Sequence, residues 1–421
     1  HPYVMVDTAF FDGDFKARLL ATFDDLDGAT DGVLIHGENS QALNLMQAKY
    51  GGQVKCIYID PPYNTGSDEF LYKDNYQHSS WLAMMSDRLS LGRRLLTCAG
   101  AIFVQIGDEE QASLKLLMDD VFGEQNFRNT IVVRRGIKSV QAQFDDITAL
   151  AVGHDKVLMF SKSDRARFPK LLEMLPESEP GKWDTFWRGT DRKTMRYEIF
   201  GLKPDTGQWR WKEERGLEAK VAYEEYLTKY AQDMSLDEYY LLHLAEVGEK
   251  LNFVRQSEDG VVQYYVPPRE YKLMSDVWLG VRTRGDVTDF TTEKHTELVG
   301  KISNWIAEED GLTLDFFAGS GTTAHAVMEL NRGDGGTRKY ILVEMGGHFE
   351  MVLKPRIQKV AFSANWKDGV PQDRDGQSHT FKYQRIESYE DALNNIRVRR
   401  PEGAQRRLLY DEFDDYQLHY M

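Results

Sequence analysis

The sequence has few of the features that mark secreted, membrane-bound or metal-rich proteins. Its 421 residues include two cysteines, Cys56 and Cys98, which is too few for a disulfide framework or a cysteine-rich metal site. It contains no apolar run of about 18 residues or more and no basic-then-apolar N-terminal segment, so neither a membrane span nor an intact signal peptide is expected. These absences favour a globular protein of the reducing cytoplasm, with both cysteines as small buried side chains. Because the chain begins at His1 and neither end resembles a natural boundary, we expect a fragment of a longer protein.

An excess of positive charge is also missing, since the formal net charge is −15. Phosphate contacts need local Lys and Arg rather than a basic total, so this value does not exclude a nucleic-acid partner. Acidic runs near the two ends, Asp24–Asp27 and Asp411–Asp415, are expected as solvated faces.

Short apolar segments alternate with helical patterns in two separate stretches of the chain. Strands are expected in the first stretch, residues 31–163, at Val33–His36, Val54–Asp60, Ala101–Gly107 and Lys156–Ser161, with a helix at Ser79–Leu96. Strands are expected in the second stretch, residues 291–361, at Leu312–Phe316 and Tyr340–Glu344. This alternation predicts an α/β fold in which helices cover a mostly parallel sheet.

Residues 164–290 interrupt that alternation. They carry Pro, Gly, Trp and many charges, then a helical run at Leu217–Leu251 and a β-like segment at Val261–Val266. We therefore expect one half of a sheet domain in 1–163, an inserted domain in 164–290, the other half in 291–375, and a C-terminal extension in 376–421. Within that extension, Phe381–Arg400 is expected to form an amphipathic helical segment that packs on the parent domain or docks a partner.

The loop Asp60–Gly66, Asp-Pro-Pro-Tyr-Asn-Thr-Gly, directly follows an apolar strand. The end of a buried strand is where an α/β sheet presents ligand-contacting residues. Pro61 and Pro62 fix φ and prevent further sheet pairing, so the loop is rigid. Asp60 offers a carboxylate beside free carbonyl groups, and Tyr63 offers an aromatic face, which together suit the exocyclic amine of a flipped-out base. A strand-ending turn would explain a bare Asp-Pro-Pro triplet, but the full run after a hydrophobic strand favours a functional loop.

A second loop, Asp315–Ala324, joins a short strand to a helix expected from Thr322. Gly319 and Gly321 allow a sharp turn and a close approach to a ligand. Further along the chain, Glu344 ends a strand and is placed to bind ribose hydroxyls. The glycine loop and this acid predict an adenosine-type cofactor. Asp315 favours S-adenosylmethionine over a nicotinamide dinucleotide, because a carboxylate repels a pyrophosphate and attracts an ammonium group.

Taken together, Asp-Pro-Pro-Tyr at 60–63 and Phe-x-Gly-Ser-Gly-Thr-Thr at 317–323 resemble the signature motifs of DNA amino-methyltransferases. The catalytic motif precedes the cofactor motif, with room for a target-recognition region between them, as in the β group of these enzymes. Residues 31–361 fit that layout. The segments Asp60–Phe70, Ser79–Trp81 and Met84–Leu89 are similar to modification (Mod) subunits of type III restriction systems. The resemblance implies a Rossmann-like S-adenosylmethionine-dependent methyltransferase sheet with an inserted target-recognition domain and a C-terminal extension.

The resemblance also implies roles for individual residues. It places Asp60, Pro61, Pro62 and Tyr63 on the target base, and it forms the cofactor pocket from Asp315, Phe317, Gly319, Gly321 and Thr322, with Glu344 on the ribose. Glu38 stands where the family often has an acid near the cofactor adenine. Lys294 stands where the family has a Lys-Pro segment that contacts the methionine carboxylate, but His295 replaces the proline here. Asp108 is a further candidate, equally well explained as a solvated loop residue.

The implied reaction is direct methyl transfer to an amine nitrogen, without a metal or a covalent enzyme intermediate. Cytosine C5 methylation is disfavoured, because it needs a thiolate that typically follows proline, whereas Cys56 follows Lys55 and Cys98 follows Thr97. In family terms, an Asp at position 60 favours the N6 amine of adenine, and the N4 amine of cytosine stays as the alternative. An Asn would be typical of protein glutamine methylation.

Alternatives of other classes remain. A non-catalytic DNA-binding subunit with a vestigial methylase fold is disfavoured by the intact motifs at 60–63 and 319–321. A DNA-recognition subunit whose methylase activity depends on a partner stays as an alternative. A nicotinamide oxidoreductase explains the glycine loop but leaves Asp60–Gly66 without a role.

Residues 182–215 combine nine Lys or Arg with six Asp or Glu and four of the eight tryptophans, Trp183, Trp187, Trp209 and Trp211. This combination suits contact with phosphates and bases, although a small domain core explains the tryptophans equally well. The expected DNA-binding residues are Arg188, Arg192, Lys193 and Arg196, with Arg134, Arg135 and Lys138 upstream. The expected partners are double-stranded DNA and, from the resemblance, a second copy or a restriction or helicase subunit, and no membrane.

Overall fold

The structure is a computed structural model that describes residues 2–65, 78–135, 150–283, 293–367, 369–387 and 393. The chain forms two compact units, which we call the sheet unit (His1–Pro169 with Asp276–Met421) and the inserted unit (Lys170–Ser275). The sequence analysis ends the insertion at residue 290, whereas the chain already returns to the sheet unit at Asp276.

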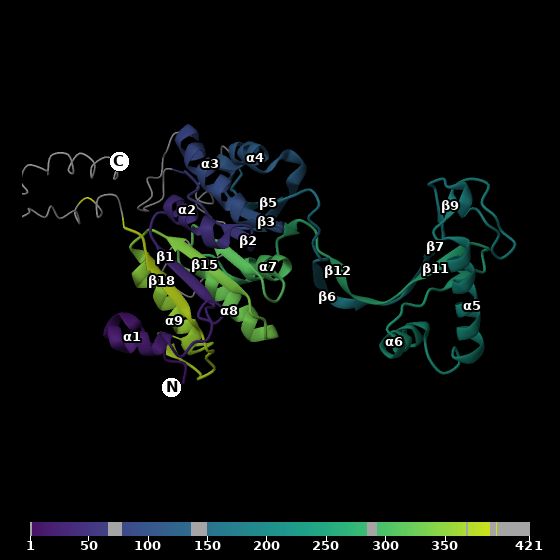
Figure 1. The fold of residues 1–421 in the computed structure, drawn as a ribbon. Coiled ribbons are helices and arrows are strands. Elements are labelled where there is room, and N and C mark those ends of the chain that lie inside the picture. Colours follow the sequence, from purple (N-terminus) through teal and green to yellow (C-terminus); the bar gives the residue numbers. More distant parts are fainter. Residues whose placement is uncertain are drawn as a thin grey trace, which may run out of the picture. The chain divides into compact units, whose positions relative to one another are not determined.

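Within the described part of the sheet unit, nine strands form one sheet (Figure 1). Their spatial order is β13 (Val277–Trp278), β4 (Phe127–Arg134), β5 (His154–Ser161), β3 (Leu96–Ile106), β2 (Val54–Ile59), β14 (Leu312–Asp315), β15 (Lys339–Glu344), β1 (Gly32–His36) and β18 (Phe381–Arg385). β5 runs antiparallel to both of its neighbours, and the other pairs are parallel. Central strands such as β2 are apolar almost throughout because both of their faces are buried.

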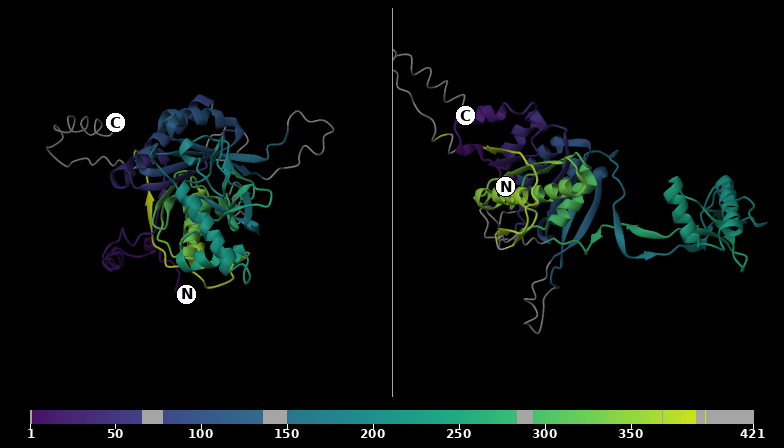
Figure 2. Two further views of the ribbon diagram at one scale, coloured as in Figure 1. Left: turned by 90° about the vertical axis from the view of Figure 1, so that its right-hand side faces the viewer. Right: turned by 90° about the horizontal axis from the view of Figure 1, so that it is seen from below.

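Helices cover the two faces of this sheet (Figures 1 and 2). The first face carries α2 (Asn39–Tyr50), α3 (His78–Leu95) and α4 (Asp108–Phe122), and the second carries α7 (Thr296–Ala307), α8 (Thr322–Asp334) and α9 (Lys354–Phe362). Alternate residues of β15 pack into the cores on opposite faces of the sheet. Ile341 and Val343 join the core cluster that contains Leu89, while Tyr340 and Leu342 join the cluster that contains Ile357. This is the period-2 pattern of a strand buried between two layers.

Shorter elements complete the sheet unit. They are η1 (Thr8–Phe10), α1 (Gly13–Leu20), η2 (Glu124–Asn126), the π-helix η5 (Phe349–Leu353) that leads directly into α9, β16 (Trp366–Lys367) and β17 (Val370–Pro371). Among the described residues, no helix combines the length and apolar character needed to cross a membrane.

The inserted unit has its own core. Its elements are β6 (Leu172–Glu179), β7 (Lys182–Thr185), β8 (Trp187–Arg188), η4 (Lys193–Met195), β9 (Gln208–Trp209), α5 (Glu213–Lys229), α6 (Leu236–Val247), β10 (Val254–Gln256), β11 (Val262–Val266) and β12 (Arg269–Leu273). Trp209 is buried, and Trp183 and Trp211 pack against the aromatic clusters around Phe186 and Phe253. Trp187 differs from these three because it is 43% exposed.

Two expectations from the sequence are wrong. Phe381–Arg385 does not begin a helical segment; it forms β18, a parallel edge strand beside β1, with Phe381 paired to Gly32 and Arg385 to His36. Aromatic and polar residues alternate along this strand, so that Phe381 and Tyr383 both face the cluster that holds Phe349. Residues 388–392 and 394–400 of the expected helix lie outside the described residues. Cys98 is exposed rather than buried, whereas Cys56 is buried.

Candidate active site

The two sequence motifs meet at one edge of the sheet. β2 and β14 are parallel neighbours, with Ile57 paired to Leu314, and β14 and β15 are parallel neighbours, with Asp315 paired to Leu342. Asp60, Asp315 and Glu344 therefore all lie at the carboxyl ends of adjacent strands. From β2 the chain continues through α3 to β3 on one side, and from β14 it continues through α8 to β15 on the other. The carboxyl ends of β2 and β14 therefore form the topological switch point at which open α/β sheets bind ligands.

Asp60 has one paired and one unpaired carboxylate oxygen. Its Oδ2 lies 3.1 Å from the Lys294 ammonium nitrogen, while the buried Oδ1 has no hydrogen-bond partner among the residues that the structure describes. Burial raises the pKa of the Asp60 carboxyl, and the Lys294 charge acts in the opposite direction. A buried acceptor without a donor is costly, so Oδ1 is placed to accept a hydrogen bond from a bound ligand.

Tyr63 lies in the same group of side chains. Its hydroxyl accepts from Lys294 Nζ at 3.4 Å and donates to Asp155 Oδ2 at 3.3 Å, and Nζ lies 5.2 Å from the ring centroid. Asp155 also accepts from Gln105 Nε2 at 3.1 Å. Burial raises the pKa of the Tyr63 hydroxyl far above its ordinary value, so this group stays protonated and can donate.

The prolyl loop is held from behind by side chains of α3 and α4. Trp81 Nε1 donates to the Pro62 carbonyl at 2.9 Å, and Trp81 itself is 1% exposed. Asn64 has a left-handed backbone with φ of 61°, and its amide donates to the buried carboxylate of Glu110 at 2.6 Å. These contacts, together with Pro61, fix the backbone around Tyr63, which is the preorganisation expected of a binding loop.

The glycine loop adopts backbone conformations that other residues rarely enter. Gly319 and Gly321 have φ values of 51° and 80°, and Gly321 is the N-cap of α8. The Gly319 N–H donates to Glu344 Oε2 at 2.9 Å, which ties the loop to the end of β15. A side chain at Gly321 would meet Leu353, whose Cγ lies 3.1 Å from the position of a Cβ. Residue 321 therefore has to be glycine for both steric and conformational reasons.

Asp315 shapes the start of this loop. Its carboxylate accepts from the Phe317 N–H at 3.0 Å and from Thr323 Oγ1 at 2.6 Å. Burial raises the pKa of the Asp315 carboxyl to about 7, and the charges of Asp60 and Glu344 push it in the same direction against these two hydrogen bonds. Acidic groups gathered in this way suit a ligand with positive centres and would repel a pyrophosphate.

The remaining cofactor candidates surround the same edge. Phe317 and Thr322 are buried, and Thr322 Oγ1 donates to the Lys294 carbonyl at 3.1 Å. Glu38 caps α2 and pairs with Arg88. Lys294 thus contacts Asp60 and Tyr63 through its side chain and the glycine loop through its backbone carbonyl, contacts that the sequence did not reveal. Asp108 is the first residue of α4 and pairs with Lys156 at the surface.

The expected DNA-binding residues have different surroundings. Arg188, Arg192 and Lys193 are exposed on the inserted unit, and Arg134 is exposed at the end of β4. Arg135 lies 3.6 Å from Asp155 with half of its side chain exposed. The Arg196 guanidinium, in contrast, bonds to the carbonyls of Asp205 and Gly207 and to the Asp191 carboxylate, so its donors serve the fold of the inserted unit. Lys138 lies outside the described residues.

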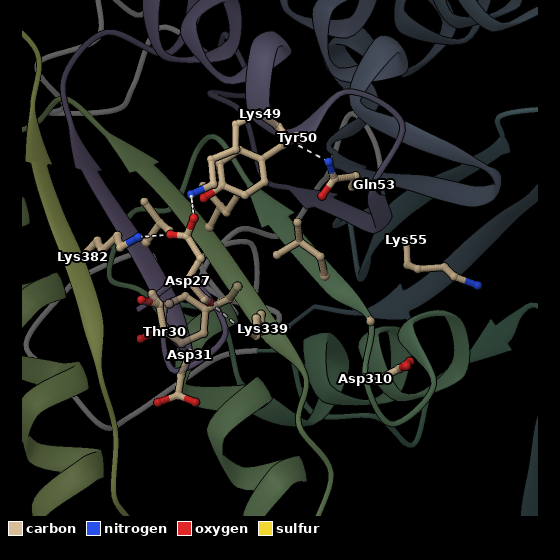
Figure 3. A pocket seen from close by; sticks show the side chains of 16 residues that line it. Asp27, Thr30, Asp31, Lys49, Tyr50, Gln53, Lys55, Asp310, Lys339 and Lys382 are labelled. Atoms are coloured by element: carbon tan, nitrogen blue, oxygen red, sulfur yellow. Dashed lines mark hydrogen bonds and ion pairs between the residues drawn. The ribbon is translucent and has the colours of Figure 1, made fainter. Parts of the chain in front are cut away.

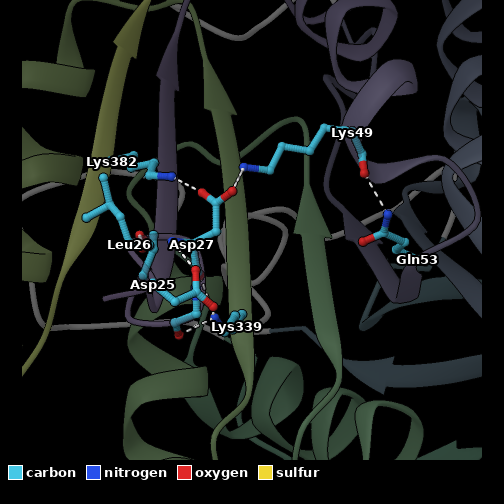
Figure 4. Close-up of polar contacts among 9 residues, drawn as sticks. Asp25, Leu26, Asp27, Lys49, Gln53, Lys339 and Lys382 are labelled. Carbon is cyan, nitrogen blue, oxygen red and sulfur yellow. Dashed lines mark hydrogen bonds and ion pairs between the residues drawn. The ribbon is translucent and has the colours of Figure 1, made fainter. Parts of the chain in front are cut away.

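A pocket of about 430 Å³ lies at the opposite, amino-terminal edge of the sheet and is not part of this site (Figure 3). Four of its lining residues, Asp27, Lys49, Lys339 and Lys382, form one polar cluster. Asp27 lies between Lys49, at 2.7 Å, and Lys382, while Lys339 donates to the carbonyls of Asp27 and Gly28 (Figure 4). The two lysines lower the pKa of Asp27 to about 2. This cluster fastens the segment before β1 to α2 and β18, which is a structural role.

Asp155 and Glu110 are the site residues that the sequence analysis missed. Asp155 is 6% exposed and Glu110 is fully buried, although both are carboxylates. Buried charged residues are rare unless paired, but a single sequence carries no sign of their burial. One signal was available for Glu110: it falls on an α4 face shared with Leu114 and Met118.

Residues 54–354 match the family model for DNA methylases (N6_N4_Mtase). The chain is 30% identical over 355 residues to the Mod subunit of the type III restriction-modification enzyme StyLTI of Salmonella typhimurium, with 74% of this chain and 52% of the relative covered. It is 31% identical over 372 residues to the type II methyltransferase M.KpnI of Klebsiella pneumoniae, with 79% of this chain and 84% of the relative covered.

A solved DNA modification methylase of Thermus thermophilus, complexed with S-adenosyl-L-methionine, is 12% identical with a TM-score of 0.43, over 85% of this chain and 100% of that chain. The chain spans about half the length of its type III relatives, 52% of the StyLTI Mod subunit and 53% of the HindVI Mod subunit of Haemophilus influenzae. The family match covers most of the chain and includes both loops at the carboxyl edge of the sheet. The chain therefore belongs to the DNA methylase family.

Proposed function

We propose that this protein transfers a methyl group from S-adenosylmethionine to the N6 amine of a flipped-out adenine in double-stranded DNA, as part of a restriction-modification or phage-defence system. The observation that carries the proposal is the buried, unpartnered Oδ1 of Asp60, beside Tyr63 and next to the glycine loop. An exocyclic amine supplies the donor that this oxygen lacks, and a flipped base supplies the ring that stacks on an aromatic side chain.

The chain's residues would act mainly by position and electrostatics. Lys294 holds Asp60 Oδ2, which leaves Oδ1 to accept from the amine together with the Pro61 carbonyl. These acceptors draw the amine lone pair out of conjugation with the base, and they stabilise the positive charge that the nitrogen gains. S-adenosylmethionine supplies the methyl group on its sulfonium centre. Asp60 is then placed to take the proton that the methylated nitrogen releases.

The cofactor fits the glycine-loop edge. Asp315, Phe317, Gly319, Gly321 and Thr322 would line its pocket, with Glu344 on the ribose and Glu38 near the adenine. Glu344 and Asp315 are acidic groups beside a loop without side chains at 319 and 321, which accommodates a ligand that carries a sulfonium and an ammonium. Lys294 would hold the methionine carboxylate in addition to Asp60, because its ammonium has three donors.

Exposed cations would bind the DNA backbone. Arg188, Arg192 and Lys193 of the inserted unit and Arg134 and Arg135 of the sheet unit are candidates for phosphate contacts. Trp187 adds an exposed aromatic face beside Arg188. Relatives named as Mod subunits of type III restriction-modification enzymes support a restriction subunit as a protein partner. A helicase subunit or a second copy is proposed from the sequence resemblance alone.

The direct test is methyl transfer from radiolabelled S-adenosylmethionine to mixed-sequence duplex DNA, followed by nucleoside analysis. We expect the label in N6-methyladenine. Label in N4-methylcytosine would leave the assigned fold and site unchanged but would show that the target base is cytosine rather than adenine. Absence of label despite cofactor binding, with and without a restriction subunit, would contradict the proposed activity.

Cofactor affinity should depend on the ionisation of Asp315. In the free protein the raised pKa keeps this carboxyl partly protonated near pH 7, and a cationic ligand favours the carboxylate. We therefore expect S-adenosylmethionine to bind more tightly as the pH rises from about 6 to about 8, with release of a proton, measured by calorimetry in buffers of different ionisation enthalpy.

The Asp315→Asn variant is the control, and it should bind with a flatter pH profile and no proton release. Without cofactor, the raised pKa gives a contribution to stability that is present below the ordinary value of 3.8 and is lost as the pH rises through about 7. A wild-type affinity that is constant over this range would contradict the pairing of Asp315 with a cation.

A further inference from the structure

A buried arginine joins the two halves of the candidate site from behind. Arg356, in the first turn of α9, is 2% exposed, and its guanidinium reaches three segments of the sheet unit. NH1 donates to Ser320 Oγ and Thr322 Oγ1, both at 3.0 Å, and Nε donates to His325 Nδ1 at 3.2 Å. NH2 lies 2.9 Å from Glu293 Oε1, which is also buried.

Three of the partners of Arg356 lie in the two separate sequence segments that form this part of the site. Ser320 and Thr322 flank Gly321 in the glycine loop, and Glu293 immediately precedes Lys294. Thr322 Oγ1 in turn donates to the Lys294 carbonyl. One guanidinium therefore fixes the glycine loop against the segment whose ammonium contacts Asp60, and these bonds are shielded from water.

Two further observations show that this contact is built into the fold. The π-helix η5 places Leu353 against Gly321, so an apolar contact and a polar contact from consecutive turns hold the same loop. Burial and the Arg356 charge lower the pKa of His325, so its ring stays neutral and Nδ1 can accept from Arg356 while Nε2 faces Glu329 at 3.3 Å.

We propose that Arg356 is a positioning residue that sets the distance between the glycine loop and Lys294, so that cofactor capture and the orientation of Asp60 depend on one buried guanidinium. The proposal rests on the proposed function, because it assigns the cofactor to this loop. Arg356 touches neither substrate in this scheme. Lysine cannot replace it, since a single ammonium cannot place its donors in the fixed fork that the four partner atoms require.

The chain offers a matched control in Arg338. This arginine is 1% exposed, lies in the same unit just before β15, and donates to Asp334 at 3.0 Å and Asn304 at 2.9 Å. It belongs to the amino-terminal edge of the sheet rather than to the site. Arg356→Lys and Arg338→Lys thus make the same change in equally buried surroundings, and only the first change is next to the glycine loop.

The experiment measures S-adenosylmethionine affinity by calorimetry and thermal unfolding for the wild type and both variants, followed by kcat and KM with duplex DNA. We expect Arg356→Lys to weaken cofactor binding by about tenfold or more and to raise the cofactor KM more than it lowers kcat. Arg338→Lys should keep wild-type affinity at a similar loss of thermal stability. Glu293→Gln, which leaves the bonds to Ser320 and Thr322 intact, should weaken binding less.

If Arg356→Lys binds S-adenosylmethionine as tightly as the wild type does, only the positioning role is overturned. The same holds if Arg338→Lys loses as much cofactor affinity as Arg356→Lys. If Arg356→Lys does not fold, Glu293→Gln decides, and unchanged affinity in that variant overturns the proposal. Failure of the wild type to bind S-adenosylmethionine would overturn the proposed function as well, which separates the two outcomes.

Discussion

Replacing Asp60 by asparagine should lower kcat for methyl transfer by about 10²–10³-fold while leaving S-adenosylmethionine affinity within about twofold of the wild type. Asparagine keeps the shape and one acceptor oxygen, but it loses the negative charge that stabilises the methylated nitrogen and pairs with Lys294. Because the variant leaves the glycine loop unchanged, the cofactor should still bind. Single-turnover transfer and calorimetry measure the two effects separately.

Asp108→Asn is the matched control for this result. Asp108 lies at the start of α4, immediately after β3, and its carboxylate is 43% exposed and pairs with Lys156. The same chemical change there should leave kcat unaltered. If Asp60→Asn kept wild-type kcat, or if both variants lost activity equally, the unpartnered oxygen of Asp60 would not be the acceptor for the base.

Replacing Gly321 by alanine should reduce cofactor affinity by more than about tenfold. Two separate energetic penalties act at this position, one conformational and one steric. The φ of 80° is unfavourable for any residue with a Cβ, by roughly 1–2 kcal/mol, and the added methyl group would meet Leu353 at 3.1 Å. The glycine loop relieves this steric clash by moving away from Leu353 of η5, which displaces the ligand-facing backbone. Calorimetry with S-adenosylmethionine measures the loss.

Gly335→Ala is the control that carries the conformational penalty without the steric one. Gly335 caps the other end of α8 with a φ of 74°, and nothing lies within 4 Å of an added Cβ. That variant should lose a similar amount of thermal stability and keep its cofactor affinity. Unaltered cofactor binding by Gly321→Ala, in a folded protein, would show that the glycine loop does not hold the cofactor.

Local patterns allowed the strands and the two loops to be predicted. β2 and β15 are apolar runs of the kind that a sheet covered on both faces requires. Asp60 follows β2 directly and Glu344 ends β15, so each strand leads to an acid at the site edge. Strands at or next to the edges of the sheet carry a weaker signal. β4, Phe-Arg-Asn-Thr-Ile-Val-Val-Arg, mixes polar and apolar residues because less of it is buried, and it was not predicted. β18 was interpreted as helical because its partner, β1, is distant in the sequence.

The connections within the site depend on long-range packing and were not visible in the sequence. Lys294 and Tyr63 are 231 residues apart, and Arg356 bonds to groups 31 to 36 residues away. No periodicity or spacing rule links such positions. The sequence could indicate which residues carry chemistry, whereas only the fold identifies Asp155, Glu110 and Arg356 as the side chains that hold them in place.

The ribbon of β6 and β12 has a consequence for how this protein can change its specificity. Leu172 pairs with Leu273, so the chain enters and leaves the inserted unit through adjacent, hydrogen-bonded residues. A segment with neighbouring ends can be exchanged for another of different length without opening the sheet to which it is attached. Under the proposed function, in which the inserted unit recognises DNA, evolution or a protein engineer can therefore replace residues 170–275 and keep the sheet unit intact.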